Sequence, residues 1–138
     1  MIVVRRLAPG DEQVVAELAE LEPPDADALL CDERTFYVAA LDDGRPVGFV
    51  FAHELLRRHG EGSMLFVYDL GVEEEYRRRG IATRLLRELA SIASDRGIRT
   101  GFVITNASNE PTMALYESVG GVRPNDDDVM WDFGYVAR

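Results

Sequence analysis

The stretch that decides the fold is residues 64–83, MLFVYDLGVEEEYRRRGIAT. Its first part, Met64–Val72, is almost continuously apolar, which predicts a β-strand buried on both faces. After Gly80 the apolar residues recur at intervals of four, four and three, which predicts one face of an amphipathic helix. The residues of that face are Ile81, Leu85, Leu89 and Ile92. A strand that leads through a short connection into a helix is typical of an α/β protein.

The connection between this strand and this helix carries three consecutive arginines. Arg77, Arg78 and Arg79 precede Gly80, and the small residue Ala82 follows. The first turn of a helix has unpaired N–H groups and a partial positive charge, so it attracts phosphate. The alternative is a solvated surface loop in which the arginines lie beside the glutamates at 73–75. Neither a P-loop nor the three-glycine dinucleotide motif is present, so the pattern predicts a pyrophosphate site of another kind.

Strands and short helices are predicted on the N-terminal side of this stretch. Alternation and β-branched or aromatic residues predict strands over 1–7, 35–41 and 46–55. The turn sequence Asp42-Asp43-Gly44 predicts a hairpin between the last two. A helix is expected to start at Pro9-Gly10-Asp11 and to be broken by residues 22–25, and a short helical piece to follow over 26–30. Residues 57–63 are polar and predict a loop.

On the C-terminal side the predicted elements alternate. The helix that begins after Gly80 is expected to end at Gly97. A strand is expected over 99–105, a loop over 106–111 and a further helix over 113–119. A final strand is expected over 129–136. The order β-α-α-β-β-β-α-β-α-β predicts one α/β domain, residues 1–138, with a mixed central sheet flanked by helices.

Composition excludes several classes of function. The formal net charge of −10 disfavours nucleic-acid binding, which needs Lys and Arg, and favours a cationic partner, although it also serves solubility. No apolar run approaches the length of a membrane span, and Met1–Arg6 enters a strand without a signal peptide, so we expect a cytoplasmic protein. One cysteine, Cys31, and two histidines, His53 and His59, predict no disulfide and no metal site.

The basic turn resembles the coenzyme motif of a known family. Arg77-x-x-Gly80-x-Ala82, after a strand that ends in Val72, is similar to the Arg/Gln-x-x-Gly-x-Gly/Ala motif of the GNAT acetyltransferases. Residues 114–120, ALYESVG, resemble the later helix of that family. The resemblance covers residues 29–120. It implies a GNAT fold and the transfer of an acetyl group from acetyl-CoA to an amine.

Within this family the chain looks most similar to the short, type I aminoglycoside 3-N-acetyltransferases. The stretches that support this are TFYVAA (35–40), RPVG (45–48), YDLGV (68–72), YRRRGIAT (76–83), NEP (109–111) and ALY (114–116). The resemblance implies acetylation of the 3-amino group of an aminoglycoside antibiotic, an activity of the resistance type, and a homodimer. The alternatives are another amine acceptor, such as a polyamine or a peptide N-terminus, and a CoA-binding sensor without catalysis.

The same resemblance assigns residues to the coenzyme. Leu70, Gly71 and Val72 are expected to bind the pantetheine arm through their backbone, with the Leu70 N–H on the thioester oxygen. The alternative for Gly71 is a bulge in the sheet. The residues expected at the pyrophosphate are Arg77, Arg78, Arg79, Gly80, Ile81, Ala82 and Thr83. Asn109 is expected to contact CoA as well.

Catalysis is assigned to three side chains. By resemblance Tyr116 is the general acid near the CoA sulfur; the alternative is a tyrosine packed in the core. Asp69 and Glu110 are candidates to bind and deprotonate the amine. Asp69 interrupts an apolar strand, where an unpaired carboxylate is costly, so its alternative is a pair with an arginine. Glu110 precedes Pro111 at a helix start, where the helix dipole alone favours a carboxylate.

Acidic residues near the C-terminus are further candidates for the acceptor site. Asp128, in the run Asp126-Asp127-Asp128, and Asp132 could line a cleft for a polyamine-like or aminoglycoside acceptor. The alternative for the run is a solvated loop. Trp131 could stack on a sugar ring or belong to the core.

Overall fold

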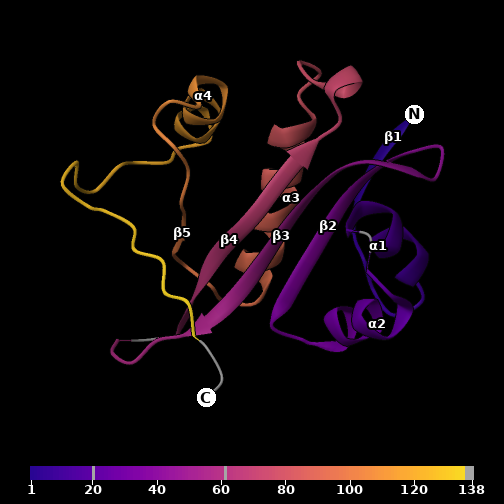
Figure 1. Cartoon of the computed structure of the whole chain (residues 1–138), viewed down its shortest axis with the longest axis horizontal. Coiled ribbons are helices and arrows are strands. Elements are labelled where there is room, and N and C mark those ends of the chain that lie inside the picture. The colour runs from indigo at the N-terminus through magenta and orange to yellow at the C-terminus, as the bar shows by residue number, and fades with distance from the viewer. Residues whose placement is uncertain (20, 61, 136–138) are drawn as a thin grey trace.

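The computed structural model describes residues 1–19, 21–60 and 62–135. One sheet with strand order β1-β2-β3-β4-β5 forms the centre of the molecule (Figure 1). The strands are β1 (Ile2–Arg6), β2 (Thr35–Asp42), β3 (Arg45–Leu56), β4 (Ser63–Val72) and β5 (Gly101–Val103). The helices are α1 (Glu12–Ala19), α2 (Pro23–Cys31), α3 (Ile81–Asp95) and α4 (Glu110–Ser118), with a 3-10 turn, η1, at Glu74–Tyr76. Strands β1 to β4 are antiparallel and β5 is parallel to β4, so the predicted α/β class with a mixed sheet is confirmed.

Helices cover both faces of the N-terminal part of the sheet. Behind the sheet, α3 packs Ile81, Leu85, Leu89 and Ala93 against alternate residues of β2 and β3. On the front, α1 and α2 bury Val15 and Ala26 against the other residues of β2. Figure 1 shows α3 passing behind β3 and β4, while α1 and α2 lie beside β2. Every side chain from Thr35 to Leu41 is therefore buried.

The predicted turns and helix ends are confirmed where they have a strong local signal. Asp43 and Gly44 have φ angles of 47° and 86°, as a tight two-residue hairpin between β2 and β3 requires. Gly97 has a φ of 77°, and the Ile98 N–H donates to the Ala93 carbonyl at 2.8 Å, which closes the end of α3. The chain does break between α1 and α2, but residues 23–25, which were predicted to lie in the break, belong to α2, because proline fits the first turn of a helix.

Strand β4 differs from the prediction in its burial. Only Leu65 of this strand is buried, and Tyr68 is 63% exposed. The prediction of burial on both faces is wrong, because α1 and α2 pack on β2 and β3 and leave the front of β4 uncovered. Pairing with β5 is limited to Leu65–Val67, so the predicted strand over 99–105 is shortened to Gly101–Val103.

The C-terminal segment also differs from the prediction. Residues 129–135 form no strand and are exposed, so the final strand expected over 129–136 is wrong for these residues; residue 136 lies outside the described part. Trp131, for which a core position was one alternative, is 76% exposed. Asp132 lies in this exposed segment, and Asp128, also exposed, directly precedes it. Within the described residues, every helix is too short or too polar to span a lipid bilayer.

Candidate active site

The turn before α3 presents free backbone amides. Arg78 and Gly80 have φ angles of 65° and 76°, and Gly80 is the N-cap of α3. In the described part of the chain no side chain caps this end, and the first amide with a backbone acceptor is that of Arg84, which donates to the Gly80 carbonyl at 3.1 Å. The N–H groups of residues 81–83 therefore remain available to a ligand. Nothing would contact a Cβ at Gly80 within 4 Å, so its glycine serves the backbone conformation.

The three arginines of this turn form no ion pair within the described residues. The Arg77 Nε donates to the Val72 carbonyl at 3.1 Å, and the Arg79 guanidinium lies 4.9 Å from the centre of the Tyr76 ring. Among the described residues neither these two nor Arg78 forms an ion pair; Glu73 instead pairs with Arg45 at 3.2 Å. The basic turn is thus not neutralised by its neighbouring glutamates, which favours an anionic ligand over a balanced surface loop.

The C-terminal half of β4 has an open edge. The Glu73 N–H donates to the Val47 carbonyl of β3 at 2.9 Å. Because N–H groups alternate between the two edges of a strand, those of Val72 and Leu70 point away from β3. No described strand pairs with β4 on that side beyond Val67. The Leu70 N–H donates to the Asp69 carboxylate at 2.9 Å, so that amide already has an acceptor within the chain.

A β-bulge at Tyr68 orients the residues around it. In the register of β3 and β4, Phe51 pairs with Asp69 while the next residue, Ala52, pairs with Val67, so Tyr68 is the extra residue. The bulge therefore lies at Tyr68, and the alternative of a bulge at Gly71 is wrong. A Cβ at Gly71 would lie 2.9 Å from the Phe49 ring, so this glycine makes room for that ring.

Asp69 lies within electrostatic range of two tyrosines. Burial raises the pKa of Tyr37 to about 12, and the Asp69 charge adds to that shift. Burial also raises the pKa of the half-buried Tyr116 above its usual value, again with a smaller contribution from Asp69. Both phenols therefore carry their proton at neutral pH. Among the described residues Asp69 forms no ion pair, so the alternative of an arginine partner for it is not found.

The charge of Asp69 reaches Tyr116, and the other candidates have only local contacts of their own within the described residues. Asn109 is the N-cap of α4, and its side chain accepts the Thr112 N–H at 3.3 Å. Glu110 is the first residue of α4 and is exposed, as the helix-dipole alternative also requires. No hydrogen bond or ion pair in the described residues joins Asp128 or Asp132 to Asp69.

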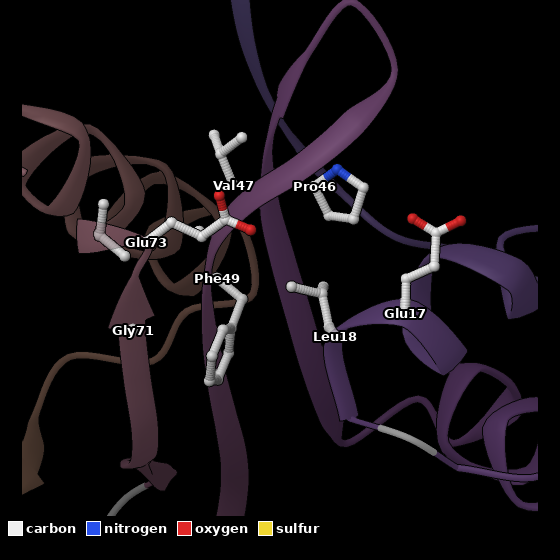
Figure 2. A pocket seen from close by; sticks show the side chains of 9 residues that line it. Glu17, Leu18, Pro46, Val47, Phe49, Gly71 and Glu73 are labelled. Atoms are coloured by element: carbon white, nitrogen blue, oxygen red, sulfur yellow. The ribbon is translucent and has the colours of Figure 1, made fainter. Parts of the chain in front are cut away.

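A groove of about 290 Å³ runs between α1 and the ends of β3 and β4 (Figure 2). The side chains of Leu18, from α1, and Phe49, from β3, line the apolar part of this groove, as Figure 2 shows. Glu17 of α1 and Glu73 after β4 line it from opposite sides. Neither glutamate was singled out in the sequence, because Glu17 lies on a helix of ordinary amphipathic pattern. The groove is apolar between two glutamates, of which Glu73 is already paired with Arg45.

Aromatic rings on the front of the sheet were also missed by the sequence analysis. Tyr68 lies 5.8 Å from both His53 and Phe66, measured between ring centroids. Phe66 stacks on Phe102 at 4.8 Å. The signal was present as aromatic residues at alternate positions, 49, 51 and 53 in one strand and 66 and 68 in the next.

Comparison with known proteins shows which family the chain resembles. Residues 6–121 match the Acetyltransferase (GNAT) family. N-alpha-acetyltransferase 30 of Schizosaccharomyces pombe is 32% identical over 88 residues, 64% of this chain and 58% of that protein. The chain thus covers less than two thirds of that relative. N-alpha-acetyltransferase RimI of Mycobacterium tuberculosis is 32% identical over 127 residues, 86% of this chain and 77% of that protein.

A solved structure matches nearly the whole chain. An aminoglycoside acetyltransferase from an uncultured soil metagenomic sample superposes with a TM-score of 0.84 at 28% identity, and the match covers 99% of both chains. The family match spans the basic turn, the open edge of β4 and Tyr116. The chain therefore belongs to the acetyltransferase (GNAT) family.

Proposed function

We propose that the chain transfers an acetyl group from acetyl-CoA to a primary amine of a small cationic acceptor, the 3-amino group of an aminoglycoside. The observation that carries this proposal is the position of Asp69, a carboxylate at the open edge of β4 whose charge reaches Tyr116. A carboxylate and a protonated phenol around one reacting centre are the two groups that amide formation from an ammonium and a thioester requires.

The residues that would hold the donor fit a molecule with linked phosphates and an extended arm. The free amides after Gly80, the small Ala82, the Thr83 hydroxyl and the unpaired arginines 77–79 suit the pyrophosphate. The outward amides of Leu70 and Val72 suit an extended arm that adds to the edge of β4, next to Gly71. When bound, acetyl-CoA supplies the acetyl group as an activated thioester.

Two protons have to move during the reaction. Asp69 would accept the first proton, from the acceptor ammonium. Tyr116 would give its proton to the departing thiolate and regain one from the same nitrogen as the amide forms. The Leu70 N–H would polarise the thioester oxygen, which requires the Asp69 carboxylate to adopt another rotamer and release that amide. Asn109, at the start of α4, is proposed to contact CoA, and Glu110, Asp128 and Asp132 are proposed to contact the acceptor. The protein is also proposed to act as a homodimer.

Support for an aminoglycoside comes from the near-complete match to an aminoglycoside acetyltransferase at 28% identity. A second acceptor, a protein N-terminus, is favoured by the 32% identity with an N-alpha-acetyltransferase over 86% of the chain. A linear polyamine is a third possibility, for which net charge is the argument.

The test is thiol release from acetyl-CoA with gentamicin, spermidine and a peptide with a free N-terminus, run in parallel. We expect turnover with gentamicin, and product analysis by NMR that places the acetyl group on the 3-amino nitrogen. Turnover with the peptide alone would replace the acceptor but keep the enzyme. CoA binding by calorimetry without turnover on any amine would make the chain a CoA sensor and refute the proposal.

A further inference from the structure

Five rings on the front of the sheet form one connected surface, here called the aromatic face. Its members are Phe51, His53, Phe66, Tyr68 and Phe102. They come from β3, β4 and β5, and each touches the next: the centroids of Phe51 and His53 are 4.8 Å apart, and those of Phe66 and Phe102 are also 4.8 Å apart. Rings in such contact leave no cage between them, so a ligand would lie on the surface they form.

The aromatic face is open to solvent in part. Tyr68 is 63% exposed and Phe102 is 39% exposed. The helices on this side, α1 and α2, pack against Tyr37, Phe49 and Phe51, at the far edge of the ring series. A contiguous set of exposed aromatic side chains is costly in water, and such patches mark binding surfaces.

The proposed catalytic carboxylate lies at the border of this surface. Asp69 is directly opposite Phe51 in the register of β3 and β4, so the two side chains are on the same face. The bulge adds Tyr68 between Val67 and Asp69 and brings its ring against Phe51 and His53. An ammonium group at Asp69 would therefore carry the rest of its molecule over the rings.

From this arrangement we infer that the aromatic face binds the body of the acceptor, and that this body is an aminosugar or aminocyclitol ring. The inference rests on the proposed function. The faces of aromatic rings carry negative charge density, so they attract ammonium groups and the polarised C–H groups that surround them. A saturated six-membered ring that bears amines offers a broad C–H face for the rings and an ammonium group for Asp69.

A linear polyamine fits this surface less well. Its chain is narrow and flexible, so it covers little of the aromatic face and loses more conformational freedom when it binds. The surface thus distinguishes acceptors by the shape of the body that carries the amine.

The experiment compares Tyr68→Leu with Tyr68→Phe. Leucine removes the ring, while phenylalanine keeps it and removes only the hydroxyl. We expect Tyr68→Leu to raise the KM for gentamicin about tenfold, with the KM for acetyl-CoA unchanged, and Tyr68→Phe to stay within about twofold of the wild type. Spermidine, if it is acetylated at all, should show the same KM with all three proteins. Circular dichroism and thermal melting verify that both variants fold.

The outcomes separate this inference from the proposed function. If the wild type acetylates no amine, the proposed function is lost. If the wild type acetylates gentamicin and Tyr68→Leu does so with an unchanged KM, the enzyme stands and the role of the aromatic face is wrong. Phe102→Leu, on the neighbouring strand, gives a second measurement should Tyr68→Leu fail to fold. A higher kcat/KM for spermidine or for the peptide than for gentamicin also overturns the assignment to a cyclic amine.

Discussion

Strands β2 and β4 are similarly apolar, yet they lie in opposite environments. In β2 the side chains of Phe36, Val38 and Ala40 face α3, and the alternate residues face α1 and α2, so both faces are covered. In β4 only the back is covered, and Tyr68 and Asp69 are exposed on the front. A strand pattern therefore reports apolar side chains, and neighbouring elements decide whether those side chains are buried.

The difference divides the molecule into two regions. The closed region, β1 to β3 with α1 to α3, contains the buried cores and should determine stability. The open region, β4, β5 and α4, contains Asp69, Tyr116 and three rings of the aromatic face, Phe66, Tyr68 and Phe102, and should determine activity. Substitutions in the two regions should therefore affect different measurements.

The largest effect should come from Asp69→Asn in the open region. Loss of the proton acceptor should lower kcat with gentamicin about 10²–10⁴-fold, while the melting temperature stays the same because the side chain is exposed. Thiol-release kinetics and thermal melting measure the two quantities. Asp43→Asn, at the tip of the β2–β3 hairpin, is the matched control and should change neither. Comparable activity of Asp69→Asn and the wild type would remove Asp69 from the mechanism.

Leu85→Ala should have the largest effect in the closed region. Leu85 is fully buried between α3 and the sheet, so its truncation should lower the free energy of unfolding by about 2–5 kcal/mol. Phe102→Ala, at a 39% exposed ring of the open region, should cost about 1 kcal/mol or less. Urea unfolding followed by circular dichroism measures both. Equal losses for the two variants would contradict the division into regions.

An alkaline pH should destabilise the protein through Tyr37. Its pKa of about 12 in the folded protein exceeds the ordinary value of 10.0, so the folded state keeps a proton that the unfolded chain releases. Stability should therefore fall as pH rises from 10 to 12, by about 1.4 kcal/mol at pH 11. Tyr37→Phe should remove this loss in urea unfolding at pH 8 and 11.

Two features help to assign the alkaline loss of stability to Tyr37. The chain contains no lysine, so no ammonium side chain titrates in that window, and Tyr116, whose pKa burial also raises, contributes a smaller part of the loss. Tyr135→Phe is the control, because this ring is 92% exposed and its replacement should keep the wild-type dependence on pH. A pH dependence that persists in Tyr37→Phe would show that another group causes the alkaline loss.

The smallest effect should come from one arginine of the basic turn. Arg78→Ala should weaken CoA binding about fivefold in calorimetry at low salt, and less at high salt, because it removes one of several charges near the phosphates. Arginine and alanine have about the same backbone strain at the φ of 65° found at position 78, so the substitution should leave the fold unaffected. Arg87→Ala, at an exposed position of α3, is the control and should bind CoA like the wild type. Equal losses for both would reduce the turn to a general charge effect.

Local patterns predicted the parts of the site that depend on local structure. The hairpin at Asp43-Gly44, the helix from Ile81 and the free amides after Gly80 follow from turn residues and from apolar periodicity within a few positions. Asp69 and Tyr116 were selected by resemblance, and the structure places them in electrostatic range of each other. The aromatic face was missed, because its rings come together only through the pairing of β3, β4 and β5, which the pattern within each strand does not show.

The sequence by itself determined the order of the elements from β1 to α4, the basic turn and the family, because each depends on neighbouring residues or on a short motif. Only the tertiary structure decided which face of β4 is exposed, where the bulge lies and that residues 129–135 form no strand. These features depend on which strands pair and which helices cover them. Contacts between distant segments set the register of a strand and decide which helices pack on it. The periodicity of residues within one segment carries no information about those contacts.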